Sequence, residues 1–224
     1  MCQLKSGIIL KDYVFVPDYD HHSNMLDELK IKDTKKNAET KFIRAELLPP
    51  NGDVFSPVDD WVFNVDQDIL PDWYVEEFDR DRFVVAIKKW ADEHVHIGKN
   101  NLEIKSGGTH YLKNCKDATL RENSTATLWE NSTATLRENS TATLRENSTA
   151  TLWGNSTATL WGNSTATLRG NSTGIIDEWS LATRNNAILL ENSTLKDCKT
   201  HTIYQSGDFK LVVVNEEDAQ NAED

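Results

Sequence analysis

Histidine and aspartate side chains gather at a few places in the first hundred residues, where their chemistry could serve metal binding or proton transfer. The segment Asp18-Tyr19-Asp20-His21-His22 combines residue types that ligate metals. His94 and His96 are two residues apart, a spacing that puts both side chains on one face of a strand. Asp59-Asp60 and Asp66-Gln67-Asp68 place carboxylates in pairs, as general acid–base catalysis requires.

Each of these groups also has a plain structural interpretation, which we prefer. No partner ligand follows residues 18–22 at helical or strand spacing, so this segment is predicted to be a polar turn before a helix capped by Ser23. His94 and His96 are expected at a solvated junction between a helix and a strand. The aspartate pairs are expected in turns that flank a strand. We therefore expect no catalytic residue, no metal and no cofactor, since the nucleophile elbow, phosphate-binding glycine loop and zinc patterns are also missing.

The elements that would position these side chains form a small α+β domain over residues 1–100. Alternating apolar residues predict strands at residues 7–17, 41–48 and 61–65, and residues 23–30 are expected to form a short helix. A longer helix over residues 79–94 has Asp79 as its predicted N-cap. Its apolar stripe, which should pack on the sheet, consists of Phe83, Val84, Ile87, Trp90 and Ala91.

The next part of the chain is a tandem repeat. Residues 118–173 are seven copies of Ala-Thr-Leu-(Arg/Trp)-(Glu/Gly)-Asn-Ser-Thr without insertion or deletion. Residues 124–128 alternate Ser, Ala and Leu with two threonines, which is the period of a β-strand, and the Asn and Gly positions suit a turn. Eight residues cannot enclose a core, so we predict a β-solenoid with two octapeptides in each 16-residue coil and coils about 4.8 Å apart.

In this solenoid Ser, Ala and Leu point inward, Asn forms an internal amide ladder, and the threonines form outward Thr-x-Thr rows. The side chain after Leu stacks on its equivalent in the next coil, which places Arg against Trp. The domain at residues 1–100 should cap one end of residues 101–214, and a bulkier C-terminal stretch should cap the other. Residues 215–224 are an acidic tail that we expect to be disordered. The predicted binding residues are Thr125, Thr127, Thr133, Thr135, Thr141, Thr143, Thr149, Thr151, Thr157, Thr159, Thr165, Thr167, Trp129, Trp153 and Trp161.

The octapeptide resembles the repeats of bacterial ice nucleation proteins. The resemblance covers residues 118–173 and includes the Thr-x-Thr pairs named above, but Arg or Trp stands where that family has stacked tyrosines, and that family's arrays are far longer. It implies 16-residue solenoid coils and suggests ice or ordered water as a ligand. Residues 61–74 are similar to uncharacterised proteins of gut bacteria and their phages, which implies no activity.

Charge and length narrow the possible partners. The formal net charge is -12, and residues 101–199 carry 10 acidic and 10 basic side chains, so the repeats lack the basic face that nucleic acid requires. No segment has the length and apolarity of a membrane span or a signal peptide, and we expect a cytoplasmic protein that binds no membrane. The predicted function is a non-enzymatic repeat protein that binds an unknown protein partner or assembles into a homo-oligomer. The alternatives are an ice- or water-ordering protein, and an enzyme or toxin with its site in residues 1–100.

Overall fold

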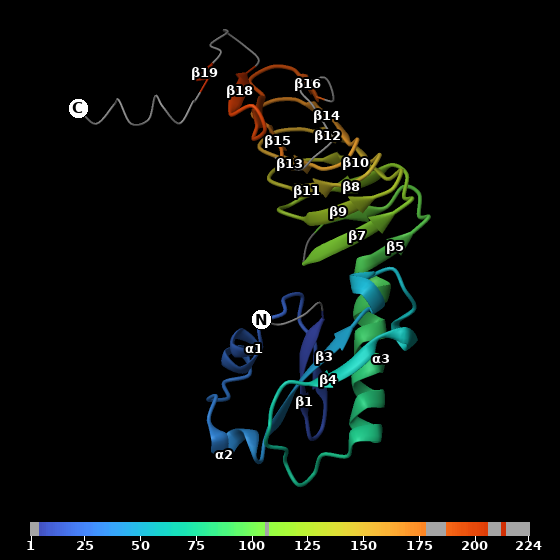
Figure 1. Ribbon diagram of the computed structural model, residues 1–224, viewed down its shortest axis with the longest axis vertical. Helices are drawn as coiled ribbons and strands as arrows, with labels where there is room; N and C mark the ends of the chain where they lie inside the picture. Colours follow the sequence, from blue (N-terminus) through green and yellow to red (C-terminus); the bar gives the residue numbers. More distant parts are fainter. Residues whose placement is uncertain (1–4, 106–107, 178–186, 206–211, 214–224) are drawn as a thin grey trace, which may run out of the picture. The chain divides into compact units, whose positions relative to one another are not determined.

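The computed structural model describes residues 5–105, 108–177, 187–205 and 212–213, and divides the chain into two compact units between Val95 and His96 (Figure 1). The first unit is α+β. Its antiparallel sheet has the strand order β2-β1-β3-β4. Its elements are β1 (Ser6–Leu10), β2 (Val14–Phe15), α1 (His22–Glu28), α2 (Lys35–Ala38), β3 (Phe42–Leu48), β4 (Val62–Val65) and α3 (Glu76–His94), with short 3-10 turns at Pro50–Gly52 and Val58–Asp60.

The core of this unit lies where the apolar residues of β1 and β3 meet the helices. Phe83 and Ile87 of α3 are fully buried, as the predicted stripe requires. Two predicted caps are wrong. Ser23 lies inside α1, whose N-cap His21 makes no side-chain hydrogen bond. Asp79 lies inside α3, where its carboxylate accepts a hydrogen bond from the backbone N–H of the N-cap Val75 at 2.9 Å, so it closes the helix start from within.

The second unit is a β-solenoid, and its register follows the 16-residue period. Thr125, Thr141 and Thr157 are successive Cα partners in parallel strands, as are Thr133 and Thr149 on the opposite side. Among the described residues, one sheet has six strands in the order β16-β14-β12-β10-β8-β6. The other sheet has nine strands in the order β19-β18-β17-β15-β13-β11-β9-β7-β5.

The bounds of the strands show how short each one is. The six-stranded sheet contains β6 (Glu103–Ile104), β8 (Ala118–Leu120), β10 (Thr133–Leu136), β12 (Thr149–Leu152), β14 (Thr165–Leu168) and β16 (Ala187–Leu189). The nine-stranded sheet contains β5 (Val95–Ile97), β7 (Thr109–Lys113), β9 (Thr125–Trp129), β11 (Thr141–Leu144), β13 (Thr157–Leu160), β15 (Thr173–Ile176), β17 (Thr194–Asp197), β18 (Thr202–Gln205) and β19 (Val212–Val213). Figure 1 shows β7 to β15 stacked as successive rungs.

The described part of the solenoid core is thin and contains no buried Phe, Tyr or Trp. The leucines and alanines of the octapeptides are buried, with all seven leucines from Leu120 to Leu168 fully so. The serines, such as Ser140 and Ser148, are also fully buried and occupy the ends of the core beside the turns. The threonines between these positions are partly or fully exposed. The predicted orientation of the repeat, with leucine inside and threonine outside, is therefore confirmed.

The residue two positions after each leucine takes a left-handed backbone conformation and makes the turn. Its φ is +57° at Glu146 and +62° at Gly162, which lie one coil apart. A Cβ atom on Gly162 would lie 3.0 Å from the backbone N and Cα of Glu146. Glycine enters this conformation without the steric cost that other residues meet. The first four turns have Glu at this position and the last three have Gly, and glycine suits both the left-handed conformation and the close stacking of the later turns.

We expect Gly162→Ala to lower the free energy of unfolding by about 1–2 kcal/mol, because alanine meets both the left-handed φ and the close backbone. Glu146→Ala is the matched control, since residue 146 already adopts this conformation with a Cβ atom, and it should change stability by less than about 0.5 kcal/mol. Chemical denaturation followed by circular dichroism measures both values. Equal losses in the two variants would contradict this account of the turn.

The parallel nine-stranded ladder ends in antiparallel strands. β17 pairs parallel with β15, whereas β18 and β19 pair antiparallel with their neighbours. The Cα partner of Thr173 is Thr194, which lies beyond the position that the 16-residue period would select, so the period breaks here. A reversal of strand direction ends the repeat of the parallel edge, and the C-terminal cap stays a prediction. The predicted acidic tail, residues 215–224, lies outside the described residues.

Candidate functional site

The threonine rows form two regular faces of the solenoid. In the nine-stranded sheet one column of Cα partners joins Thr109, Thr125, Thr141, Thr157, Thr173 and Thr194. The second column contains Thr127, Thr143 and Thr159, and is bounded by Tyr111 and Ile175. The first column extends beyond the predicted threonines at both ends. Thr109 and Thr173 were not predicted, although each lies one coil period from a predicted threonine, and Thr194 was hidden by the break in the period.

The opposite face is shorter in the described residues. Its columns contain Thr133, Thr149 and Thr165, and Thr119, Thr135, Thr151 and Thr167. The hydroxyl oxygens of Thr149 and Thr165 lie 3.0 Å apart, so neighbouring coils are joined by a side-chain hydrogen bond on the surface. Strand spacing sets these rows about 4.8 Å apart, with about 6.6–6.8 Å between the two threonines of a strand. The two faces thus repeat hydroxyl groups on a nearly rectangular grid.

The Trp/Arg corner rows are the side chains that follow each leucine. On the corner after the nine-stranded sheet, the Arg145 guanidinium lies between two indoles, 4.7 Å from the Trp129 ring and 5.5 Å from the Trp161 ring. On the other corner Arg169 lies 4.9 Å from the ring of Trp153. The predicted stacking of Arg on Trp is present, and such contacts stabilise by about 0.5–1 kcal/mol at exposed sites. Trp153 is the most exposed of the three predicted tryptophans, at 39%.

The asparagine ladder is present but lies on the outside. The Asn139 amide donates to the Asn123 side-chain oxygen at 3.1 Å, and Asn155 donates to Asn139 at 3.4 Å. All three side chains belong to exposed residues. The prediction of an internal ladder is wrong, because the buried place beside each turn is taken by the serine that follows the asparagine. Ser140 donates to the backbone carbonyl of Arg137 at 2.7 Å and thereby closes the turn from within.

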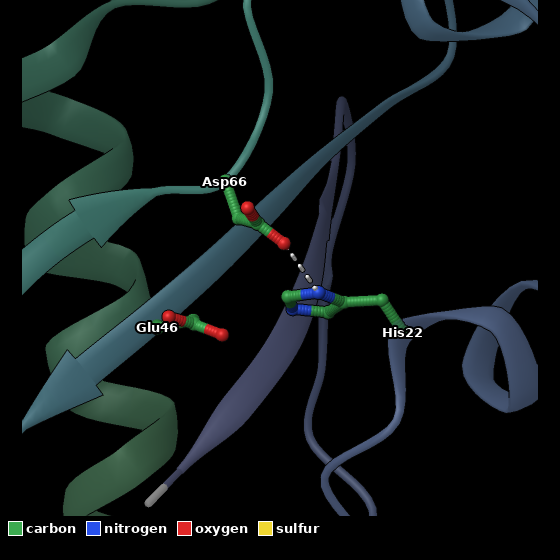
Figure 2. Close-up of side chains that lie close together, drawn as sticks. All are labelled: His22, Glu46 and Asp66. Atoms are coloured by element: carbon green, nitrogen blue, oxygen red, sulfur yellow. Dashed lines mark ion pairs between the residues drawn. The ribbon is translucent and has the colours of Figure 1, made fainter. Parts of the chain in front are cut away.

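In the N-terminal unit the structure brings together three candidate ligands that are far apart in the sequence. The His22 Nδ1 lies 3.3 Å from Asp66 Oδ2, and the carboxylate of Glu46 is close to both residues (Figure 2). His22 begins α1, Glu46 lies in β3, and Asp66 directly follows β4. His22 and Asp66 were identified separately from the sequence, whereas Glu46, which lies in β3 among mostly apolar residues, was not. A carboxylate at an inward strand position, where it is buried, was the available signal.

The two aspartates of segment 18–22 each contact a buried basic side chain. Lys5 is almost fully buried, and its ammonium lies 3.0 Å from Asp20 and donates to the Pro17 carbonyl at 2.6 Å. Burial lowers the pKa of Lys5, and the ion pair with Asp20 opposes this shift. The His94 Nε2 lies 3.0 Å from Asp18, and its ring stacks on Trp90 at 5.1 Å. The predicted polar turn is therefore held by side-chain contacts with Lys5 and His94.

The prediction of a solvated junction at His94 and His96 is wrong. His94 and His96 are 5% and 6% exposed. In the second unit the rings of His96 and His110 stack with centroids 5.6 Å apart and planes within 10°, and His96 Nε2 lies 3.4 Å from His110 Nδ1. These residues face inward because the strand alternation of β5 and β7 places them on the core side. The pairing of β5 with β7 cannot be read from the local sequence.

The remaining carboxylate pairs are distributed over the surface. Asp59 forms an ion pair with Lys88 of α3 at 2.6 Å. Asp66 and Asp68 line a groove in the surface together with Asp33, Arg44 and Gln67, and Arg44 forms an ion pair with Asp33. Among the described residues, the two aspartates of each pair share no hydrogen-bond or ion-pair partner. The expectation of no catalytic residue stays a prediction.

Comparison with known proteins adds no further assignment. No protein family, no curated protein and no solved structure matches this chain. In the part of the chain that the structure describes, no helix combines the length and the apolar character needed to cross a membrane.

Proposed function

We propose that this chain is a non-enzymatic repeat protein that binds a protein partner, or assembles with copies of itself, through the threonine faces and the Trp/Arg corner rows of its solenoid. The carrying observation is the column of six threonines from Thr109 to Thr194, which runs through coils that no longer follow the octapeptide. Regular rows offer the same contact several times, so weak individual contacts add up. Arg and Trp at the corners are residue types that are enriched at interfaces.

The charge distribution supports the same class of partner. Residues 101–199 carry equal numbers of acidic and basic side chains. A neutral, hydroxyl-rich surface does not attract the phosphate backbone of nucleic acid or an anionic membrane. We propose a cytoplasmic protein whose ligand is a protein partner or a second copy of the chain.

Face-specific variants of the full chain test the proposal. Thr141→Lys/Thr143→Lys places two cations on the nine-stranded face, and Thr149→Lys/Thr151→Lys does the same on the opposite face, so each is the matched control of the other. Trp153→Ala changes a corner. Sedimentation velocity measures self-association, and affinity capture followed by mass spectrometry measures partner binding. We expect one variant to lose the partner or the oligomer while the others keep it, and the unchanged behaviour of all three would contradict the proposal.

A second candidate function is the ordering of ice or water, which the two-dimensional spacing of the hydroxyl rows favours. The spacings of about 4.8 Å and 6.6–6.8 Å repeat over several coils, as an ordered water layer would require. Thermal hysteresis of the purified protein, compared with Thr141→Lys/Thr143→Lys, separates this function from protein binding. Thermal hysteresis that the parent shows and the variant lacks would support ice binding. A parent without thermal hysteresis would contradict this candidate function.

A third candidate is an enzyme or toxin with its site in the first unit. The grouping of His22, Glu46 and Asp66 favours this candidate, because a histidine beside two carboxylates can serve proton transfer. Partner capture or toxicity that Glu46→Gln abolishes and the threonine variants retain would support the enzyme or toxin candidate over the solenoid-based proposal.

A further inference from the structure

We propose that His22, Glu46 and Asp66 bind one divalent transition-metal ion of the Zn²⁺ type. One ring nitrogen of His22 and one carboxylate oxygen from each acid lie within 4.8 Å of one another. Figure 2 shows the three side chains converging from α1, β3 and the end of β4. Imidazole nitrogen with carboxylate oxygen is a ligand set that zinc accepts. This site differs from the expectation of no metal, and it lies outside the surfaces used in the proposed function.

The hydrogen-bond partners of the His22 ring indicate which nitrogen would ligate. Nε2 lies 3.3 Å from the backbone carbonyl oxygen of Ala45. A carbonyl oxygen only accepts, so Nε2 carries the ring proton in this contact. In the neutral ring Nδ1 then presents a lone pair, and it faces the Asp66 carboxylate at 3.3 Å. Metal-bound histidines commonly donate their other N–H to a carbonyl in this way.

The distances also fit a common metal ion. Ligand atoms at about 2.0–2.2 Å from a tetrahedral zinc are about 3.3–3.6 Å from each other. The observed 3.3 Å between Nδ1 of His22 and Oδ2 of Asp66 matches this separation. The carboxylate oxygen of Glu46 lies within 4.8 Å of both of these atoms and completes the set. Three protein ligands leave a fourth position for water.

The surroundings supply both a fixed geometry and a route for the ion. His22 is 4% exposed and Glu46 is 5% exposed, whereas the side chain of Asp66 is 56% exposed. The metal would enter from the side of Asp66, which lines the surface groove described above. β3 is paired on both sides at Glu46, whose Cα partners are Ser6 and Asn64. Two carboxylates offset the charge of a divalent ion, and this makes its partial burial favourable.

Titration of the full-length, chelator-treated protein with ZnCl₂ tests the site. Calorimetry should show that this cluster binds one zinc ion per chain. Asp66→Asn should weaken the zinc affinity by at least about 100-fold, because loss of an outer-shell group alone costs less than this. Glu46→Gln keeps the size of the side chain and should weaken binding in the same direction. Asp68→Asn is the matched control, because Asp68 lines the same groove two residues away without belonging to the cluster. It should bind zinc as the parent does.

Two outcomes would overturn the site. The first is zinc binding that is absent, or that Asp66→Asn and Asp68→Asn leave equally unchanged, which would place the metal elsewhere. The second is a long-range ¹H–¹⁵N spectrum in which both ring nitrogens of His22 remain protonated when zinc is added at pH 7. That result would identify the contact with Asp66 as an ordinary ion pair. The spectrum is recorded on the parent protein, so the test does not depend on the folding of any variant.

Discussion

Leu144→Ala should lower the free energy of unfolding of the solenoid by about 2–5 kcal/mol, the range found when a large buried aliphatic side chain is truncated. Leu144 is fully buried between Leu128 and Leu160, its Cα partners in β9 and β13. The core at each coil of the octapeptide region is only two facing strands thick and contains only small residues besides leucine. Few neighbouring atoms can move to fill the space, so the cavity remains and the cost lies toward the upper end of the range.

Thr143→Ala is the matched control for this prediction. It creates the same residue one position earlier in β11, where the side chain points out of the solenoid. The expected loss is below about 1 kcal/mol and comes from the weaker strand preference of alanine. Denaturant unfolding with circular dichroism detection compares the midpoints at equal m-values. A larger loss in Thr143→Ala than in Leu144→Ala would mean that the orientation of the repeat is reversed.

The solenoid was predictable because the same octapeptide occurs seven times in its sequence. An eight-residue unit with strand alternation and one leucine leaves a two-strand coil as the packing solution, and the pairing of Thr141 with Thr125 and Thr157 follows from it. The turn chemistry was only partly predictable. Asparagine was expected inside the turn because amides form ladders, but Ser140 is smaller and reaches the carbonyl of Arg137 from within. Asn139 is therefore displaced to the surface.

The elements of the first unit were predictable in part, but the contacts between them were not. Residues 7–17 were expected to be one strand and form the antiparallel pair β1 and β2, and α2 was not expected. The strands Phe42–Leu48 and Val62–Val65 and the stripe of α3 agree with their apolar patterns. The buried His94 contacts Asp18, which comes from near the start of the chain, whereas His94 ends the last helix of the unit. Local patterns carry no information about such pairs. Polar residues near a predicted junction were therefore assigned to solvent.

The same reason explains why the metal cluster was not predicted. A search for ligands at helical or strand spacing around His22 finds none, since Glu46 and Asp66 come from β3 and from the end of β4. The antiparallel order β1-β3-β4 brings the middle of β3 and the end of β4 to the start of α1. Ligands that are assembled by sheet topology become visible only with the register of the strands. In the solenoid the repeat sets the register, so the threonines inside the octapeptides were identified in advance, whereas Thr109, Thr173 and Thr194 of the same column were not.

Ser132→Ala should lower the free energy of unfolding by about 1–3 kcal/mol, because it removes a buried hydroxyl that other buried groups use. Ser132 is fully buried. Its Oγ lies 3.1 Å from the Leu112 carbonyl oxygen and 2.7 Å from that of Trp129, and it accepts a hydrogen bond from the backbone N–H of Cys115 at 3.1 Å. The alanine variant leaves that buried N–H without this acceptor, and the desolvation cost of a polar group that loses its partner exceeds the value of an average hydrogen bond.

Ser172→Ala is the matched control at the same position of a later octapeptide, on the opposite corner of the solenoid. Ser172 is also fully buried, but its Oγ has no hydrogen-bond partner among the described residues. Removing this hydroxyl loses no bond and relieves a desolvated polar atom, so the variant should be as stable as the parent or slightly more stable. Urea unfolding at equal m-values measures both variants. Equal losses would show that the serines act through their size alone, whereas the expected difference would show that the solenoid core is held at its ends by individual hydrogen bonds and that later coils can be improved at these positions.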